Sequence, residues 1–175
     1  MADDRELWER ICRGDTRAFD GFYQENVSRL NGFLRQLLGN IQTAEDVAQE
    51  TFLQLWRRPN GFHPETGSLR AYLFGIGRKR AAEWWRQRKP TADEQETVRR
   101  ECKTETSSLV GDSFSRLGAD ERTLLWLREV EGQSYAVLAR ILDIPVGTVK
   151  SRLFAAREEL RRVWHSSRPE KKVGP

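Results

Sequence analysis

Apolar residues recur at steps of three and four positions along almost the whole chain, and this spacing constrains the fold more than any other feature. Such steps place side chains on one face of an α-helix, whereas a strand needs alternation with a period of two. Valine, isoleucine and threonine never alternate with polar residues over the length of a strand. The sequence therefore predicts an all-α protein. The first apolar series comprises Leu7, Ile11, Phe19, Phe22, Tyr23, Val27, Leu30, Phe33, Leu34, Leu37 and Leu38.

Helix-breaking and capping residues mark the ends of the predicted helices. Gly39-Asn40 ends the first series, and Thr43 is a suitable N-cap for a helix that stops near Pro59. The loop that follows, residues 60–68, is rich in glycine, proline and asparagine. Its last residue, Ser68, can cap a further helix that runs to about residue 89.

Two blocks of helical periodicity are separated by a segment that has none. Residues 91–113 are rich in threonine, serine and glutamate and indicate a flexible acidic linker. A second helical block runs from about residue 115 to 164, and the polar end of the chain indicates a disordered tail. We therefore expect two small helical domains joined by a tether, divided as 1–90, 91–113, 114–165 and 166–175.

The composition argues against several classes of protein. No stretch approaches the roughly 18 consecutive apolar residues of a membrane-spanning helix. The acidic start of the chain is not followed by the apolar segment of a secretory signal. The two cysteines, Cys12 and Cys102, form no CxxC motif and have no histidine cluster nearby, so neither a disulfide framework nor a metal site is expected. We expect a cytoplasmic protein that uses no cofactor and does not insert into membranes.

Charge is concentrated in particular segments. Residues 68–90 hold seven basic side chains against one acidic side chain, and residues 116–175 hold twelve against eight. Basic patches indicate a polyanionic partner, most often nucleic acid. A solvated basic surface explains the charge counts alone more simply, so the decision rests on the motifs.

Residues 133–162 have the layout of a helix-turn-helix. Ser134 can cap a short helix, and Asp143 occupies the turn, where it has to tolerate a left-handed or bridge conformation. An ordinary helical hairpin is the alternative, but it does not require the small Ala139, the turn and an early Lys-Ser-Arg together. The second helix begins near Thr148. Its predicted inward residues are Val149, Leu153, Ala156 and Leu160.

The outward residues of this second helix are candidates for contacts with DNA. Lys150 and Ser151 lie in its first turns, where side chains reach base edges. Arg152 and Arg157 are better placed for phosphates. The predicted set is Thr148, Lys150, Ser151, Arg152, Phe154 and Arg157.

The segment SYAVLARILDIPVGTVKSRLFAAREEL resembles region 4 of bacterial sigma factors, specifically of the extracytoplasmic-function (ECF) group. Upstream, TAEDVAQETFLQLWRR is similar to region 2.2 of the same group, and residues 69–89 resemble regions 2.3 and 2.4. The two motif sets occur in the family's order and spacing. The resemblance implies a sigma factor, which binds core RNA polymerase through its β′ and β subunits and directs promoter-specific transcription initiation.

The resemblance also implies which residues of the first domain bind polymerase. In the family, region 2.2 docks on a coiled coil of the β′ subunit. A polar row beside a leucine is compatible with that role, although the same row is typical of any amphipathic helix with a solvated face. The implied residues are Asp46, Gln49, Glu50, Leu53, Trp56 and Arg57.

The family opens and reads the −10 promoter element with the loop 60–68 and the helix after it. On a helical wheel Trp84 falls on the inward stripe, whereas Trp85 projects roughly 100° away, beside basic residues. We therefore expect Trp84 in the core and Trp85 as a candidate for stacking on single-stranded DNA, with packing against the first helices as the alternative. The implied −10 residues are Phe62, His63, Arg78, Lys79, Trp85, Arg86 and Arg88.

The chain departs from the family's usual pattern at several positions, so a promoter sequence cannot be transferred to it. Lys79 stands where asparagine is usual, and Asp143 replaces a frequent glycine. The family further implies an anti-sigma partner, mutual occlusion of the two domains, and a linker that enters the polymerase cleft.

Two alternatives to a sigma factor are a free-standing helix-turn-helix regulator and an enzyme. No phosphate loop, metal-ligand cluster or nucleophile–base pair favours an enzyme.

Overall fold

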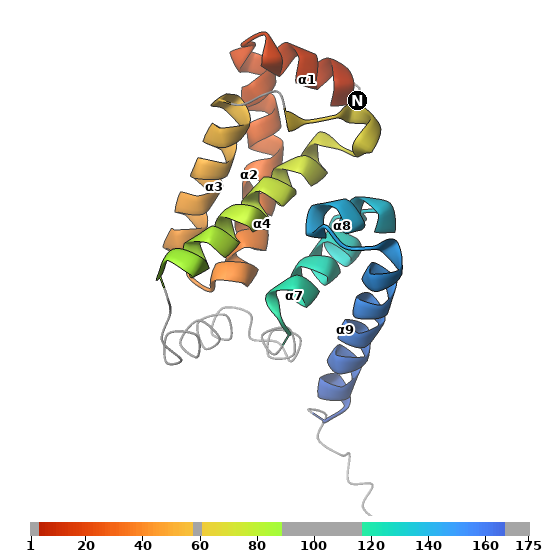
Figure 1. Cartoon of the computed structure of the whole chain (residues 1–175). Coiled ribbons are helices and arrows are strands. Elements are labelled where there is room, and N and C mark those ends of the chain that lie inside the picture. Colours follow the sequence, from red (N-terminus) through yellow and green to blue (C-terminus); the bar gives the residue numbers. More distant parts are fainter. Residues whose placement is uncertain (1–3, 58–60, 89–116, 167–175) are drawn as a thin grey trace, which may run out of the picture.

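The computed structural model describes residues 4–57, 61–88 and 117–166, and every regular element in these ranges is a helix. The first group contains α1 (Asp4–Cys12), α2 (Thr16–Leu38), α3 (Ile41–Arg57), the short 3-10 helix η2 (Pro64–Thr66) and α4 (Leu69–Arg88). The second contains α7 (Ala119–Leu125), the π-helical turn η3 (Trp126–Val130), α8 (Tyr135–Leu142) and α9 (Val146–Ser166) (Figure 1). The all-α prediction is confirmed. The predicted linker and nearly all of the predicted tail lie outside the described residues.

Helices α2, α3 and α4 form the core of the first group. Gly39 turns the chain between α2 and α3 with φ 73°, a left-handed value that glycine adopts without strain. Leu30, Leu55 and Phe74 are completely buried where the three helices meet. Burial of each such side chain contributes on the order of 1.5–3 kcal/mol, so this layer is what holds α4 in place.

Side chains cap the starts of α2 and α4. Asp15 accepts the backbone N–H groups of Arg17 and Ala18 at the start of α2, which lowers the pKa of its carboxyl. Ser68 caps α4 as predicted, because its hydroxyl accepts the N–H of Ala71 at 3.1 Å. Asp4 of α1 also accepts the N–H of Leu69 at 2.9 Å.

The predicted cap at Thr43 is wrong. Helix α3 begins at Ile41, two residues earlier, because the Asn40 side chain accepts the Thr43 N–H at 2.9 Å and so supplies the cap itself. Asparagine is at least as good an N-cap as threonine, so the structure uses the stronger of the two neighbouring signals.

The second group contains the predicted helix-turn-helix in α8 and α9. Ser134 caps α8, and Asp143 adopts the left-handed conformation with φ 54°. Helix α9 begins at Val146, two residues before the expected start. The predicted inward residues are buried, except that Leu160 is only partly covered.

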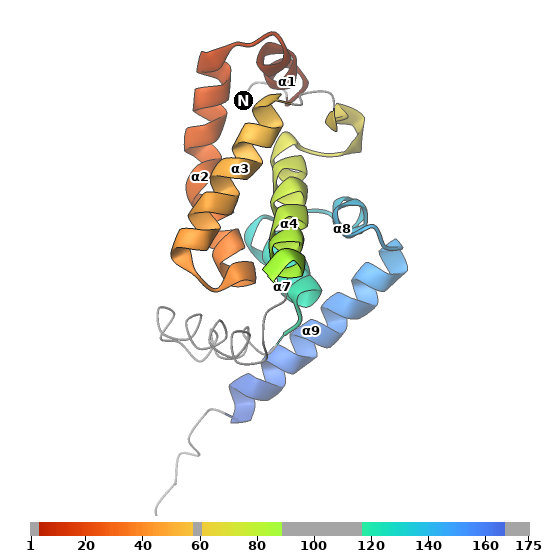
Figure 2. The same cartoon turned by 60° about the vertical axis from the view of Figure 1, so that its left-hand side comes forward.

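The two groups pack against each other, with α4 between α3 and α8 (Figures 1 and 2). Helix α2 also contacts α7. Glycines of the first group allow this approach: a Cβ added at Gly32 would lie 3.4 Å from the Trp126 ring, and one added at Gly67 would lie 3.3 Å from Val137. The two predicted domains therefore share an interface.

A glycine pair tests the packing of α4. A Cβ at Gly77 would lie 3.1 Å from Leu30 Cδ1 inside the buried layer, whereas a Cβ at Gly21 meets nothing within 4 Å. We expect Gly77→Ala to lower the free energy of unfolding by about 1 kcal/mol, because overpacking exceeds the gain in helix propensity. Gly21→Ala should raise it by about 0.5–1 kcal/mol. Urea denaturation measures both, and a gain in stability from Gly77→Ala would contradict this packing.

Candidate docking groove and nucleic-acid interface

An apolar groove of about 490 Å³ runs between α2 and α3. Phe19 stacks 4.8 Å from Trp56, and Tyr23 lies 4.7 Å from Phe52, measured between ring centroids. Leu53 borders the groove and is 41% exposed, which is unusual for a leucine in the middle of a helix. The aromatic rings thus hold open a surface on which an apolar side chain of a partner can lie.

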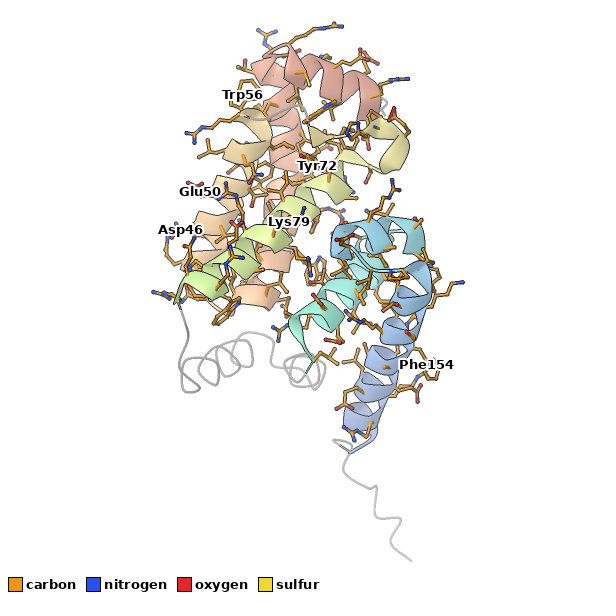
Figure 3. The ribbon with its side chains drawn as sticks, viewed as in Figure 1. Asp46, Glu50, Trp56, Tyr72, Lys79 and Phe154 are labelled. Carbon is orange, nitrogen blue, oxygen red and sulfur yellow. The ribbon has the colours of Figure 1, made fainter. Side chains whose placement is uncertain are left out.

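Three of the predicted polymerase residues, Gln49, Leu53 and Trp56, line this groove, and the other three lie on the exposed side of α3. Asp46, Gln49, Glu50 and Arg57 are exposed at helical spacing, and Trp56 is half-buried in the groove wall. Figure 3 shows Asp46, Glu50 and Trp56 following α3 on the side away from the second helical group. The structure therefore brings the whole predicted set together on one helix. Glu50 also pairs with Arg80 of α4 at 3.3 Å.

Phe62 is buried, which corrects the expectation that its side chain is placed to contact the −10 element. It is 5% exposed and packs edge-on against Trp8, with ring centroids 5.3 Å apart. Its ring also lies 5.7 Å from that of Tyr72. Three aromatic residues distant in sequence form this cluster, so inspection of the loop alone could not reveal it. His63, the other predicted loop residue, is exposed.

Both adjacent tryptophans are half-buried at the end of α4, and Trp85 has the packing against the first helices that was the alternative to DNA contact. Trp85 donates its indole N–H to the Leu37 carbonyl at 3.2 Å and is thereby fixed to α2. Trp84, expected in the core, is only half-buried and carries the Arg88 guanidinium 4.7 Å above its ring. The two rings meet edge to face at 4.9 Å. The α2–α3 turn reaches around the end of α4, so the buried side differs there from the middle of the helix.

The predicted basic residues of α4 fall into two classes. Lys79, Arg86 and Arg88 are exposed. Arg78 instead points toward the second helical group and forms an ion pair with Asp120 of α7 at 2.8 Å. The exposed cations are available to a polyanion, whereas Arg78 is occupied in this arrangement.

Helix α9 presents three of the predicted −35 residues to solvent in its first half. Lys150, Ser151 and Phe154 are exposed, and Thr148 is half-buried near the helix start. Phe154 is 65% exposed and points into solvent (Figure 3), a position that suits apolar contact with a thymine methyl group.

The two arginines of α9 each meet an acidic residue. Arg157 bonds to Glu129, which raises the pKa of its guanidinium. Arg152 lies 3.3 Å from Asp120. Both arginines are therefore paired with a carboxylate of the elements beside α9, and a phosphate would have to compete with it.

A cleft of about 360 Å³ between α4 and α8 was not predicted from the sequence. Tyr72 and Lys79 line it from α4, and Val137, Arg140 and Ile141 line it from α8. Burial raises the pKa of the Tyr72 hydroxyl. No local motif marks this cleft, because its two walls come from segments that are far apart in the sequence.

Within the described ranges, no three histidine, cysteine or acidic side chains come close enough together to hold a metal ion. In the same ranges, none of the helices combines the length and the apolar character that a bilayer crossing demands.

The chain matches two family models in series. A model described as sigma-70 region 2 matches residues 22–91, and one described as sigma-70 region 4 matches residues 109–160. The RNA polymerase sigma-H factor of Pseudomonas aeruginosa is 31% identical, over 90% of this chain and 91% of that protein. The ECF RNA polymerase sigma-E factor of Haemophilus influenzae is 30% identical, over 89% of this chain and 92% of that protein.

Solved structures share the arrangement of helices. CnrH, solved in complex with the cytosolic domain of CnrY, superimposes with a TM-score of 0.73 at 23% identity and covers 95% of this chain and 99% of its own. The sigma factor RpoE of Bartonella quintana, solved with the anti-sigma factor NepR, gives a TM-score of 0.65 at 25% identity. That match covers 85% of this chain and 99% of RpoE.

The hydrogen bond of Trp85 provides a test of its environment. We expect Trp85→Phe to lower the free energy of unfolding by about 0.5–1.5 kcal/mol, because the Leu37 carbonyl loses its donor. The affinity for a single-stranded oligonucleotide should change less than about twofold, since a phenyl ring still offers a stacking face. Trp84→Phe is the matched control, because the Trp84 N–H bonds to no described residue. Equal losses of stability in the two variants would show that the Trp85 hydrogen bond contributes nothing.

Proposed function

The chain belongs to the ECF group of the sigma-70 family of RNA polymerase sigma factors, and we propose how its two helical groups divide the work of promoter recognition. As a sigma factor it binds core RNA polymerase and promoter DNA and directs transcription initiation. The family consists of initiation factors rather than enzymes. In the proposed division, residues 1–90 bind polymerase and open the −10 element, and residues 114–165 read the −35 element. Residues 91–113 would then serve as the linker and 166–175 as a tail.

The surface of α3 and its groove is the proposed docking site for core polymerase. The observation that carries this assignment is the exposed Leu53 beside an aromatic groove, bordered by a row of polar residues on one helix. A helix of a partner can lay an apolar residue into the groove while Asp46 and Gln49 bond to its polar side. A coiled coil of the β′ subunit, which the family resemblance implies, has this chemistry.

The proposed −10 surface is the basic side and C-terminal end of α4. Lys79, Arg86 and Arg88 supply exposed positive charge, and the Trp84 and Trp85 rings lie beside it. A positively charged track with aromatic rings is the usual surface for single-stranded DNA, so this end of α4 suits the melted strand. Phe62 can contribute only after its contacts with Trp8 and Tyr72 are released.

The proposed −35 surface is the exposed side of α9. Lys150, Ser151 and Phe154 lie in the first half of this helix, the part that enters the major groove in helix-turn-helix proteins. A duplex-specific contact from Lys150 is worth about 1–3 kcal/mol of discrimination when it is well formed.

The two helical groups have to separate before both surfaces engage one promoter. The positions −10 and −35 differ by about 25 base pairs, or roughly 85 Å along the duplex. A compact chain of this length has a radius of gyration of roughly 16 Å. The packing of α4 on α8 therefore belongs to a state of the protein that is not engaged with a promoter.

An anti-sigma protein is the proposed partner of that state. RpoE, whose fold this chain shares, was solved with the anti-sigma factor NepR. The cleft between α4 and α8 is open to such a partner, and Lys79 and Arg140 give it a positive rim. We place the protein in the cytoplasm, where polymerase and DNA are found.

Run-off transcription with bacterial core polymerase and a pool of promoters tests the proposed docking site. We expect promoter-specific transcripts with the wild-type protein and at least a roughly tenfold loss with Asp46→Arg/Gln49→Ala, because charge and contact are reversed at the docking face. The matched control is Glu25→Arg/Gln24→Ala, which makes similar changes on an exposed part of α2 away from the groove.

The two variants and the wild type separate the possible outcomes. An equal loss of transcripts with both variants would contradict the proposal that α3 is the docking site. Salt-sensitive binding to particular duplexes without any transcripts would instead favour a free-standing regulator.

A further inference from the structure

Asp120 lies in the first turn of α7, where the two helical groups meet, and touches an arginine from each DNA-reading helix. Its Oδ1 accepts from Arg78 of α4 at 2.8 Å, and its Oδ2 lies 3.3 Å from Arg152 of α9. The two carboxylate oxygens are thus divided between a proposed −10 residue and a proposed −35 residue.

Only one of these two contacts crosses the boundary between the groups. Arg152 belongs to the same group as Asp120, so that pair survives when the groups separate. Arg78 belongs to the other group, and its side chain is 23% exposed in the closed arrangement. Separation would therefore expose Arg78 while leaving Asp120 beside Arg152, which keeps the carboxylate oriented.

The surrounding contacts place Asp120 within a continuous boundary. Arg29 of α2 approaches the Glu131 carboxylate at 3.4 Å, and the Glu131 side chain is 1% exposed. Val137 faces the backbone at Gly67, and Ile141 faces Gly75 of α4. The apolar contacts supply area but no charge selectivity, whereas the two ion pairs respond to competing anions, and of these only Arg78–Asp120 involves a proposed DNA-binding residue.

We propose that Asp120 is an anionic latch: its carboxylate occupies Arg78 in place of a DNA phosphate and holds the two helical groups together until nucleic acid replaces it. This inference rests on the proposed role of α4 in DNA binding. Carboxylate and phosphate oxygens both accept charge-assisted hydrogen bonds from a guanidinium, so a phosphate competes with Asp120 for Arg78. The latch therefore keeps the free protein from binding single-stranded DNA at full strength, and DNA in turn favours the open state.

The test uses the full chain with a fluorescent dye in each group. One dye is attached at the exposed Cys12 of α1 and the other at Arg162→Cys on α9, with Cys102→Ser removing the remaining thiol. Energy transfer between the dyes measures how close the two helical groups are. DNA binding is measured with a 20-nucleotide single-stranded oligonucleotide. Asp120→Asn removes the charge but keeps the shape, and Glu121→Gln removes the same charge one residue away.

We expect Asp120→Asn to lower energy transfer and to tighten binding of the oligonucleotide roughly two- to fivefold, as loss of one competing ion pair allows. Glu121→Gln should leave energy transfer unchanged, and it should alter the affinity for the oligonucleotide less than Asp120→Asn does. In an Arg78→Gln background, Asp120→Asn should cause no further loss of transfer, because the latch is already absent. Adding the oligonucleotide should lower transfer in the wild-type protein.

Three results would overturn the latch. Unchanged transfer in Asp120→Asn, lower transfer without tighter binding, or equal effects of Asp120→Asn and Glu121→Gln each contradict it. Circular dichroism confirms that the variants are folded. Run-off transcription keeps the two proposals separate, because a wild-type protein that gives no transcripts contradicts the proposed division of promoter recognition, while the transfer data still report whether Asp120 holds the groups together.

Discussion

Helix α4 is buried from two directions, and the rest of the structure depends on this arrangement. Phe74 and Gly77 pack against α2 and α3, while Gly75 faces α8. A surface helix normally turns one apolar stripe to the core and a polar face to water. Because α4 has apolar contacts on two sides, its positive charge is restricted to the remaining surface and to its C-terminal end. Contact with α8 and contact with DNA therefore compete for parts of the same helix.

The all-α class and the helix-turn-helix could be predicted from the sequence because their determinants are local. Ser134 caps the next turn, Asp143 tolerates a left-handed backbone, and Val149 and Leu153 lie on one face by spacing alone. Each depends on residues within a few positions of it, which is the range that periodicity and capping rules cover. The error at Thr43 arose at the same range, where two residues three positions apart, Asn40 and Thr43, could both cap α3.

The burial of Phe62 and the hydrogen bond of Trp85 could not be predicted from the sequence for a different reason. Phe62 packs against Trp8, and Trp85 bonds to Leu37, and neither partner lies on the same helix or loop. A helical wheel describes a helix in isolation, whereas the end of α4 is covered by the turn between α2 and α3. The partners of Asp120 were equally hidden, because a single carboxylate in a helix start carries no sign of an arginine on another helix. Resemblance to a family suggests the role of a residue, but it does not say whether the side chain is buried or bonded to another helix in a given conformation of the protein.

The contact between Asp4 and the N–H of Leu69 bears on the order in which the protein folds. This hydrogen bond joins residues 65 positions apart, and it completes the first turn of α4 from outside that helix. Closing a long loop costs entropy that only later contacts offset, so such a contact forms late. The α2–α3 hairpin, which is held by local contacts, can form first. We expect the start of α4 to become protected from hydrogen exchange only after α1 has docked, so that the helix proposed to open promoters is itself among the last parts of its group to be completed.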